Sequence, residues 1–125
     1  MRKTITIPLY PLTRSGVQKD REMFGGKYTL EMLKYLPQKP KWSLYSGDVS
    51  VRVDFGFKDM HAGNVPDIDN LLKPLFDFVK GSLFRDDRQV KAVRAFIHGG
   101  MVQPFIRVAV RDYVPVKVPP ITLDI

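Results

Sequence analysis

The sequence predicts a single α/β (α+β) domain with a mixed β-sheet and helices packed on one side of it. Its 125 residues, 44% of them hydrophobic, are enough to form one apolar core. Segments with strand and helix periodicity follow one another in the order strand, helix, strand, helix, strand, strand, which favours a mixed sheet. No repeat, low-complexity tract or internal linker interrupts the chain, so residues 1–125 are expected to form one domain.

The first third of the chain predicts one strand and one helix. In residues 3–9, "KTITIPL", isoleucine and leucine alternate with threonine and proline, as in a half-buried strand. Residues 11–27 combine glycines, a proline and several cations, and are expected to form a loop. Residues 28–36, "YTLEMLKYL", predict a helix that ends before Pro37.

The middle of the chain predicts a buried strand followed by an amphipathic helix. Residues 48–58, "DVSVRVDFGFK", place five apolar side chains on one face and polar ones on the other. Further on, apolar residues recur at i, i+4, i+7 and i+8 from Leu71, and Gly81 ends the pattern. Because Pro74 lacks an N–H group, we expect the helix to begin at about Asn70 or Leu71, with Pro74 in or next to its first turn.

The last third of the chain predicts two strands and an extended end. Residues 88–97 and 105–113 have strand periodicity, and a glycine-containing connection joins them. His98 in this connection, like His61 earlier, lies beside glycine and is expected to be solvated. The proline-rich residues 114–125 are expected to form an extended tail.

The composition excludes several classes of protein and favours a nucleic-acid partner. The absence of cysteine excludes disulfides, thiolate zinc sites and a cysteine nucleophile. No apolar run is long enough for a signal peptide or a membrane span, so we expect a cytoplasmic protein without a membrane partner. The net charge of +7 favours polyanionic partners, yet five of the thirteen acidic residues fall between residues 66 and 87. Carboxylates on a phosphate-binding protein make sense when they hold a metal ion.

The stretch "PDIDNLLKPLFDFVKG" places two acids and a lysine at the start of the predicted helix. If the segment is extended, Asp67 and Asp69 point to the same side, and a divalent cation would relieve their repulsion. The alternative is that both acids are ordinary helix caps. Lys73 lies at the unfavourable end of the helix dipole, which costs a few tenths of a kcal/mol, and projects towards the acids. The alternative interpretation of Lys73 is that it forms a surface ion pair with Asp69 or Asp77, worth about 0.3–0.5 kcal/mol.

The following "RDD" adds Asp86 and Asp87 in the turn before the next strand. Taken alone, these acids favour ordinary turn chemistry. Together with the pair at the start of the helix, they predict a cluster of carboxylates and one ammonium group at one edge of the sheet. Oxygen ligands with open positions suit Mg²⁺ or Mn²⁺, which would activate a water molecule while the lysine stabilises the phosphate.

The run "PDIDNLLKPLFDFVKGSLFRDDRQV" closely resembles the core motif of RusA-type Holliday junction resolvases, a D-x-D-N-x-x-K helix followed by D-D-x-Q-V. The resemblance implies that Asp67, Asp69 and Asp87 are catalytic acids that bind Mg²⁺ and that Lys73 is the catalytic lysine. It gives supporting roles to Asn70, Asp86 and Gln89. It also implies a bacterial or phage-encoded homodimer that resolves four-way DNA junctions by paired, symmetric nicks in DNA recombination and repair.

The leading hypothesis is therefore a Mg²⁺-dependent endodeoxyribonuclease that acts on branched DNA. Two alternatives stay open: a non-catalytic nucleic-acid-binding domain, and a nuclease for other branched or single-stranded DNA. The expected DNA-binding residues are seven cations that lie in the 11–27 segment, before the motif or beside its second acidic pair: Arg14, Lys19, Arg21, Lys27, Lys58, Arg85 and Arg88.

Overall fold

The computed structural model describes residues 2–59 and 66–117, which form one sheet with a layer of helices on one face. The elements in chain order are β1 (Arg2–Ile7), α1 (Arg14–Met23), α2 (Lys27–Tyr35), the 3-10 helix η1 (Lys41–Ser43), β2 (Val49–Gly56), α3 (Ile68–Val79), the 3-10 helix η2 (Asp87–Gln89), β3 (Val90–His98) and β4 (Phe105–Asp112).

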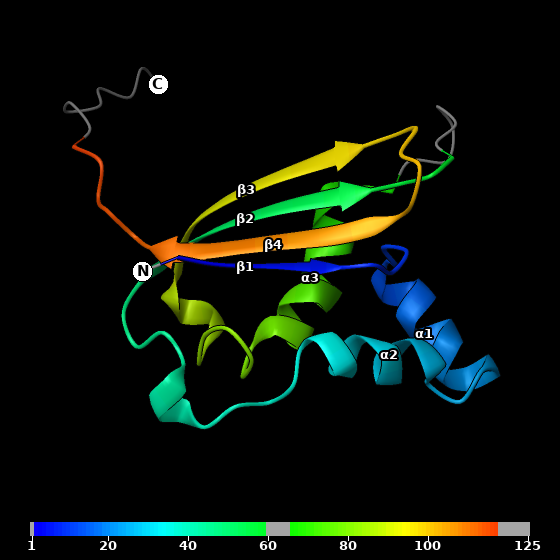
Figure 1. Ribbon diagram of the computed structural model, residues 1–125, viewed down its shortest axis with the longest axis horizontal. Coiled ribbons are helices and arrows are strands. Elements are labelled where there is room, and N and C mark those ends of the chain that lie inside the picture. Colours follow the sequence, from blue (N-terminus) through cyan, green and yellow to red (C-terminus); the bar gives the residue numbers. More distant parts are fainter. Residues whose placement is uncertain (1, 60–65, 118–125) are drawn as a thin grey trace, which may run out of the picture.

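The sheet is mixed, as predicted, with the strand order β1-β4-β2-β3. β2 and β3 are parallel, and α3 lies between them in sequence as the crossover; the other neighbouring strands are antiparallel. All three α-helices lie on the same side of the sheet, and the opposite face has no helix over it (Figure 1). The predicted α+β class with helices on one side is confirmed.

The core lies between the sheet and the helices. Alternate residues of β2, from Val49 to Phe55, are buried on this side, as the period of two predicts. From α3, Leu71, Leu75 and Val79 are each no more than 2% exposed, which confirms the predicted apolar stripe. This packing fixes the position of α3 and of the polar residues at its two ends.

The prediction of a loop over residues 11–27 is wrong, because most of that segment forms α1. Thr13 caps this helix: its Oγ1 accepts a hydrogen bond of 3.2 Å from the Gly16 N–H. Val17 is then buried in the core. Gly25 and Gly26, both at positive φ, form the turn into α2. Three of the cations in this segment, Arg14, Lys19 and Arg21, lie on the solvent-exposed side of this helix.

The predicted start of α3 is also wrong by two or three residues. The helix begins at Ile68, so Pro74 lies inside it and Asp69 is already helical. Proline at this position removes the hydrogen bond to the Asn70 carbonyl. Pro74 is, however, buried among residues of α1, α2 and β2, where Val17 and Met32 line the same small interior cavity. Burial of the ring offsets the lost hydrogen bond, a tertiary effect that helix propensity does not include.

The two last strands agree with prediction, and part of the predicted tail is described. β3 and β4 fall within two residues of the expected ranges. Residues 114–117 form neither helix nor strand, whereas the rest of the predicted tail, and His61, lie outside the described residues. None of the described helices has the length and apolar character needed to cross a membrane.

Candidate active site

Two carboxylates stand exposed at the start of α3. Asp67 is the N-cap residue, with an extended backbone (φ −67°, ψ 142°), but its side chain makes no capping hydrogen bond. Asp69 lies in the first helical turn, where the helix dipole favours a negative charge. Asp67 therefore does not cap the helix through its side chain, and both carboxylates are open to a ligand from solvent.

Lys73 lies one turn further along α3 and is also exposed. Within residues 2–59 and 66–117 it forms no ion pair with Asp69 or Asp77, so the surface-pair interpretation is not supported. Asn70 lines a surface hollow together with Arg14 from the first turn of α1. The N-terminal end of α3 thus gathers two acids, an amide and two cations.

The acids of the "RDD" turn differ from each other. Asp86 is the N-cap of η2: its Oδ1 accepts a 2.9 Å hydrogen bond from the Arg88 N–H, and its Oδ2 lies 3.3 Å from the Arg88 guanidinium. These interactions, the backbone hydrogen bond first, lower the pKa of Asp86. Asp87 is exposed, and its side chain makes no hydrogen bond or ion pair with any other described residue. The turn-forming interpretation therefore holds for Asp86, and Asp87 is the acid available for chemistry.

Gln89 holds this turn in place with four hydrogen bonds. Its Oε1 accepts from the backbone N–H groups of Arg85 (2.7 Å) and Asp86 (2.8 Å). Its Nε2 donates to the carbonyls of Tyr45 and Gly47, each at 2.8 Å. The supporting role implied for Gln89 is therefore a structural one: it ties the turn that carries Asp87 to the segment before β2.

Replacing Gln89 with alanine is expected to lower the free energy of unfolding by about 2 kcal/mol, because four backbone groups lose a partner and some regain water. Urea unfolding followed by circular dichroism measures this loss. Arg88→Ala, a neighbouring exposed substitution that removes only a surface ion pair, serves as the control and should change stability by less than about 0.5 kcal/mol. Equal stability of the two variants would contradict the anchoring role of Gln89.

The structure does not bring Asp87 to the other two acids within one chain. Asn70, next to Asp69, lines the same hollow as Thr13, which follows β1 in the chain. β1 ends level with the end of β2, so the acids at the start of α3 lie at that end of the sheet. Asp87 instead precedes β3 at the opposite end of the sheet, where Val90 pairs with Val49 at the start of β2. α3, whose 12 residues span about 18 Å, runs between these two ends of the sheet.

The predicted three-carboxylate cluster is therefore wrong for a single chain. No group of three potential metal-ligating acids or histidines lies together in the described parts of the chain. The side chains have the chemistry that Mg²⁺ prefers, but their placement in one chain does not fit a metal ion held by all three. Sequence spacing suggested a cluster because the helix was expected to return the second acidic pair to the edge of the sheet where the first one lies.

All seven predicted DNA-binding cations are exposed, and they lie in three separate parts of the chain. Arg14, Lys19 and Arg21 lie on α1, and Lys27 begins α2. Of these, Arg14 lines the hollow beside Asn70 at the start of α3, whereas Arg21 lines a hollow with Asp77 further along that helix. Lys58 follows β2, whereas Arg85 and Arg88 flank Asp87. The last two also stabilise their turn: Arg85 Nε donates to the Lys41 carbonyl at 3.1 Å, and Arg88 pairs with Asp86.

His98 is not a solvated loop residue, contrary to expectation. It ends β3, its Nε2 lies 2.7 Å from Asp54 Oδ1, and its ring stacks on Phe105. Arg52 also donates to Asp54 through Nε (3.1 Å) and Nη2 (3.3 Å). Burial raises the pKa of Asp54, whose residue is 8% exposed, but hydrogen bonds from Arg52 and His98 outweigh that effect and lower it. This cluster lies on the helix-free face of the sheet.

Sequence reasoning missed the arginines on that same face. β2, β3 and β4 each carry at least one arginine at an outward-facing position, and β1 begins with one. The signal was present in the alternation of each strand, for example in "VRVDF" and "FIRVAVRD". The strand order that makes these positions neighbours was not available from the sequence.

The chain matches the model of a known protein family. The model of the family described as Endodeoxyribonuclease RusA matches residues 18–111, which is most of the chain and includes every predicted catalytic residue. No curated protein matches the chain. RusA-type enzymes are endodeoxyribonucleases that resolve Holliday junctions, are generally dependent on divalent metal ions and are typical of bacteria and phages. The exposed acids and lysine of α3 and the extent of the match lead to one conclusion: this chain belongs to the RusA endodeoxyribonuclease family.

Proposed function

We propose that this protein is a homodimeric, Mg²⁺- or Mn²⁺-dependent endonuclease that resolves four-way DNA junctions by paired, symmetric nicks during DNA recombination and repair. The observation that carries the proposal is the exposed group at the start of α3, Asp67 and Asp69 with Lys73, on a chain with a net charge of +7. The helix dipole favours these carboxylates but does not require two of them without side-chain partners, and on a basic protein they suit a metal ion that meets a phosphate.

The separation of the acids supports a site shared between two copies of the chain. Asp67 and Asp69 lie at one end of α3, and Asp87 follows its other end. A second copy, related by a two-fold axis, can place its Asp87 beside the first copy's Asp67 and Asp69, and the reverse holds for the second site. Such a dimer has two equivalent sites, as paired cuts in opposite strands require.

The proposed roles of the side chains follow from their chemistry. Asp67, Asp69 and the second copy's Asp87 would hold the divalent ion, which when bound supplies positive charge at the phosphate and a more acidic water. Lys73 carries an ammonium that stabilises negative charge on the phosphate or on the leaving oxygen. Arg14, which lies next to this end of the helix, would contact the DNA backbone there, together with the other cations of α1.

A cleavage assay tests the proposal directly. The purified protein is incubated with an end-labelled four-way junction and with a linear duplex of the same sequence, with Mg²⁺ or with EDTA. We expect paired nicks in the junction with Mg²⁺, none with EDTA and little cutting of the duplex. Binding of the junction without any cleavage would favour a non-catalytic nucleic-acid-binding domain. Equal cutting of both substrates, or preferential cutting of other branched DNA, would support the proposed chemistry but contradict the proposed substrate.

A further inference from the structure

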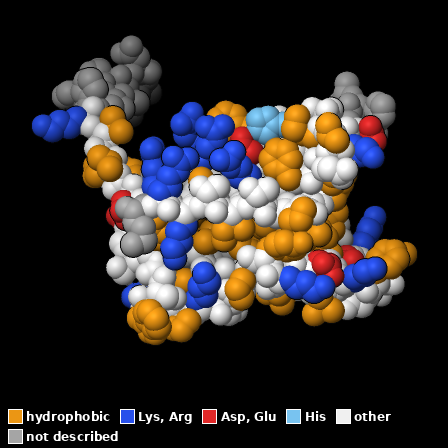
Figure 2. All heavy atoms as spheres, viewed as in Figure 1, with side chains coloured by type: hydrophobic (Ala, Val, Ile, Leu, Met, Phe, Trp, Pro, Cys, Tyr) orange, Lys and Arg blue, Asp and Glu red, His pale blue; other side chains and the backbone are white. Residues whose placement is uncertain are grey.

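The face of the sheet opposite the helices carries a set of arginines that the proposed catalytic chemistry does not use. They occupy outward positions on all four strands, as the strand pairing and exposure show. We call this set the open-face arginines: Arg2, Arg52, Arg94, Arg107 and Arg111. Figure 2 shows Lys and Arg side chains gathered over this part of the sheet.

The strand register places like charges directly opposite one another. Arg2 of β1 pairs with Arg111 of β4, and Arg52 of β2 pairs with Arg94 of β3. Like charges at opposed positions of neighbouring strands destabilise a sheet. Among the outward positions of the four strands, Asp54 supplies the one carboxylate, and it already binds Arg52 and His98. This arrangement does not serve the stability of the isolated fold.

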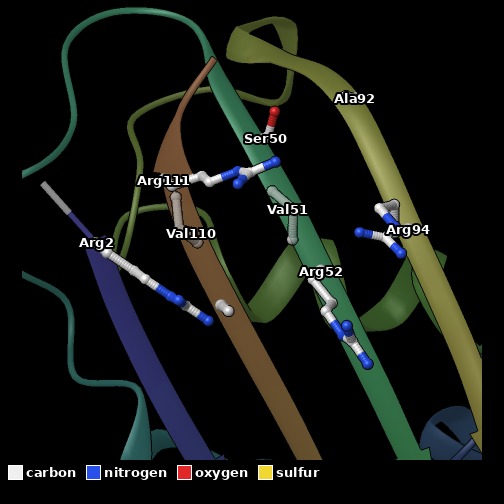
Figure 3. A pocket seen from close by; sticks show the side chains of 9 residues that line it. Arg2, Ser50, Val51, Arg52, Ala92, Arg94, Val110 and Arg111 are labelled. Atoms are coloured by element: carbon white, nitrogen blue, oxygen red, sulfur yellow. The ribbon is translucent and has the colours of Figure 1, made fainter. Parts of the chain in front are cut away.

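The guanidinium groups line a common hollow. Arg2, Arg52, Arg94 and Arg111 surround a depression of about 160 Å³ floored by β2 and β4 (Figure 3). The Cζ atoms of Arg52 and Arg94 lie 4.6 Å and 5.7 Å from the centre of the Phe96 ring, which holds both groups above the sheet. Part of the cost of ordering these long side chains is therefore met before a ligand arrives.

We propose that the open-face arginines dock the phosphate backbone of a DNA duplex, at a surface separate from the acids of α3. Duplex DNA carries one negative charge per about 1.7 Å of its axis, so several phosphates can face arginines spread over four strands that together span about 14 Å. Guanidinium forks match phosphate oxygens, and the acid-poor face does not repel them. The inference rests on the proposed function for the identity of that duplex as an arm of the junction.

The test measures binding without cleavage. Fluorescence anisotropy with a labelled four-way junction and a labelled duplex is recorded in EDTA over a range of salt concentrations. The test variant is Arg94→Gln with Arg111→Gln. The control variant is Lys34→Gln with Lys39→Gln, which removes the same charge from exposed residues in or after α2.

We expect the arginine variant to bind both DNAs more weakly, by a factor on the order of ten or more at about 0.1 M salt, and to lower the salt-dependence slope by about 2. The lysine variant should change neither quantity appreciably. Thermal unfolding of the arginine variant should not occur at a lower temperature than that of the wild type, because opposed positive charges are removed. This separates a binding defect from misfolding.

Two results would overturn the inference. One is wild-type affinity and slope in the arginine variant, or a loss equal to that of the lysine control. The other is binding of anionic phosphatidylserine vesicles in preference to duplex, abolished by the same two substitutions, which would assign the face to a lipid surface. Because no cleavage is measured, an absence of nuclease activity would overturn the proposed function and leave this result standing.

Discussion

Replacing Asp67 with asparagine is expected to reduce cleavage of a four-way junction by more than about 100-fold while leaving junction binding intact. The change removes one negative charge from the proposed ligand set and keeps the shape of the side chain. Binding should persist or become tighter, because a carboxylate near the scissile phosphate repels it in the absence of a metal ion. Single-turnover cleavage in Mg²⁺ and anisotropy in EDTA measure the two effects separately.

Asp77→Asn is the matched control, since Asp77 is an exposed acid on the same helix. It should cleave at close to the wild-type rate. Stability should be unaffected by Asp67→Asn, within about 0.5 kcal/mol, because the Asp67 side chain makes no capping hydrogen bond. Cleavage by Asp67→Asn at the wild-type rate would show that Asp67 is not part of the active site. An equal loss of cleavage in both variants would indicate a general effect of charge.

Mixing two inactive variants is expected to restore activity, and this is the second large effect. If each site takes Asp67 from one copy and Asp87 from the other, Asp67→Asn and Asp87→Asn homodimers have no intact site. A heterodimer of the two variants has one defective site and one intact site. With random exchange of subunits, about a quarter of all sites become functional, and each heterodimer makes one nick instead of a pair.

The control is a mixture of Asp67→Asn with Asp69→Asn, two residues that lie at the same end of α3. In that mixture every site keeps one substitution, so no activity should return. Copurification through two different affinity tags establishes that heterodimers have formed. If they form and Asp67→Asn with Asp87→Asn stays inactive, then Asp87 is not shared between copies and the proposed arrangement is incorrect.

Local patterns predicted much of the fold. The alternation of apolar residues in β2 and the helical stripe from Leu71 to Val79 determine which faces are buried, and both predictions were confirmed. α1 was missed because its glycine and cations resemble a loop, and its stability depends on the Thr13 cap and on burial of Val17. The early start of α3 depends on the burial of Pro74, which is a property of the packed core.

The candidate site could be predicted residue by residue, but its arrangement could not. The motif from Asp67 to Gln89 predicts which acids and which lysine form the site, and the family match covers this motif. The side-chain hydrogen bonds distinguish the acids that stabilise the fold from the others. The Asp86 side chain caps η2, whereas the side chains of Asp67 and Asp87 make no capping hydrogen bond. These bonds depend on backbone geometry that sequence spacing does not define.

The sequence by itself therefore determined the class of fold and the family, and it predicts the reactive residues, because all three depend on residue types and on short-range periodicity. Only the tertiary structure decided that α3 holds Asp67 and Asp87 apart, at opposite ends of the sheet. It also decided that Arg2 lies opposite Arg111 and Arg52 opposite Arg94. The physical reason is the same in both cases: strand order and register set which distant residues become neighbours, and periodicity along the chain determines only the face on which each one lies.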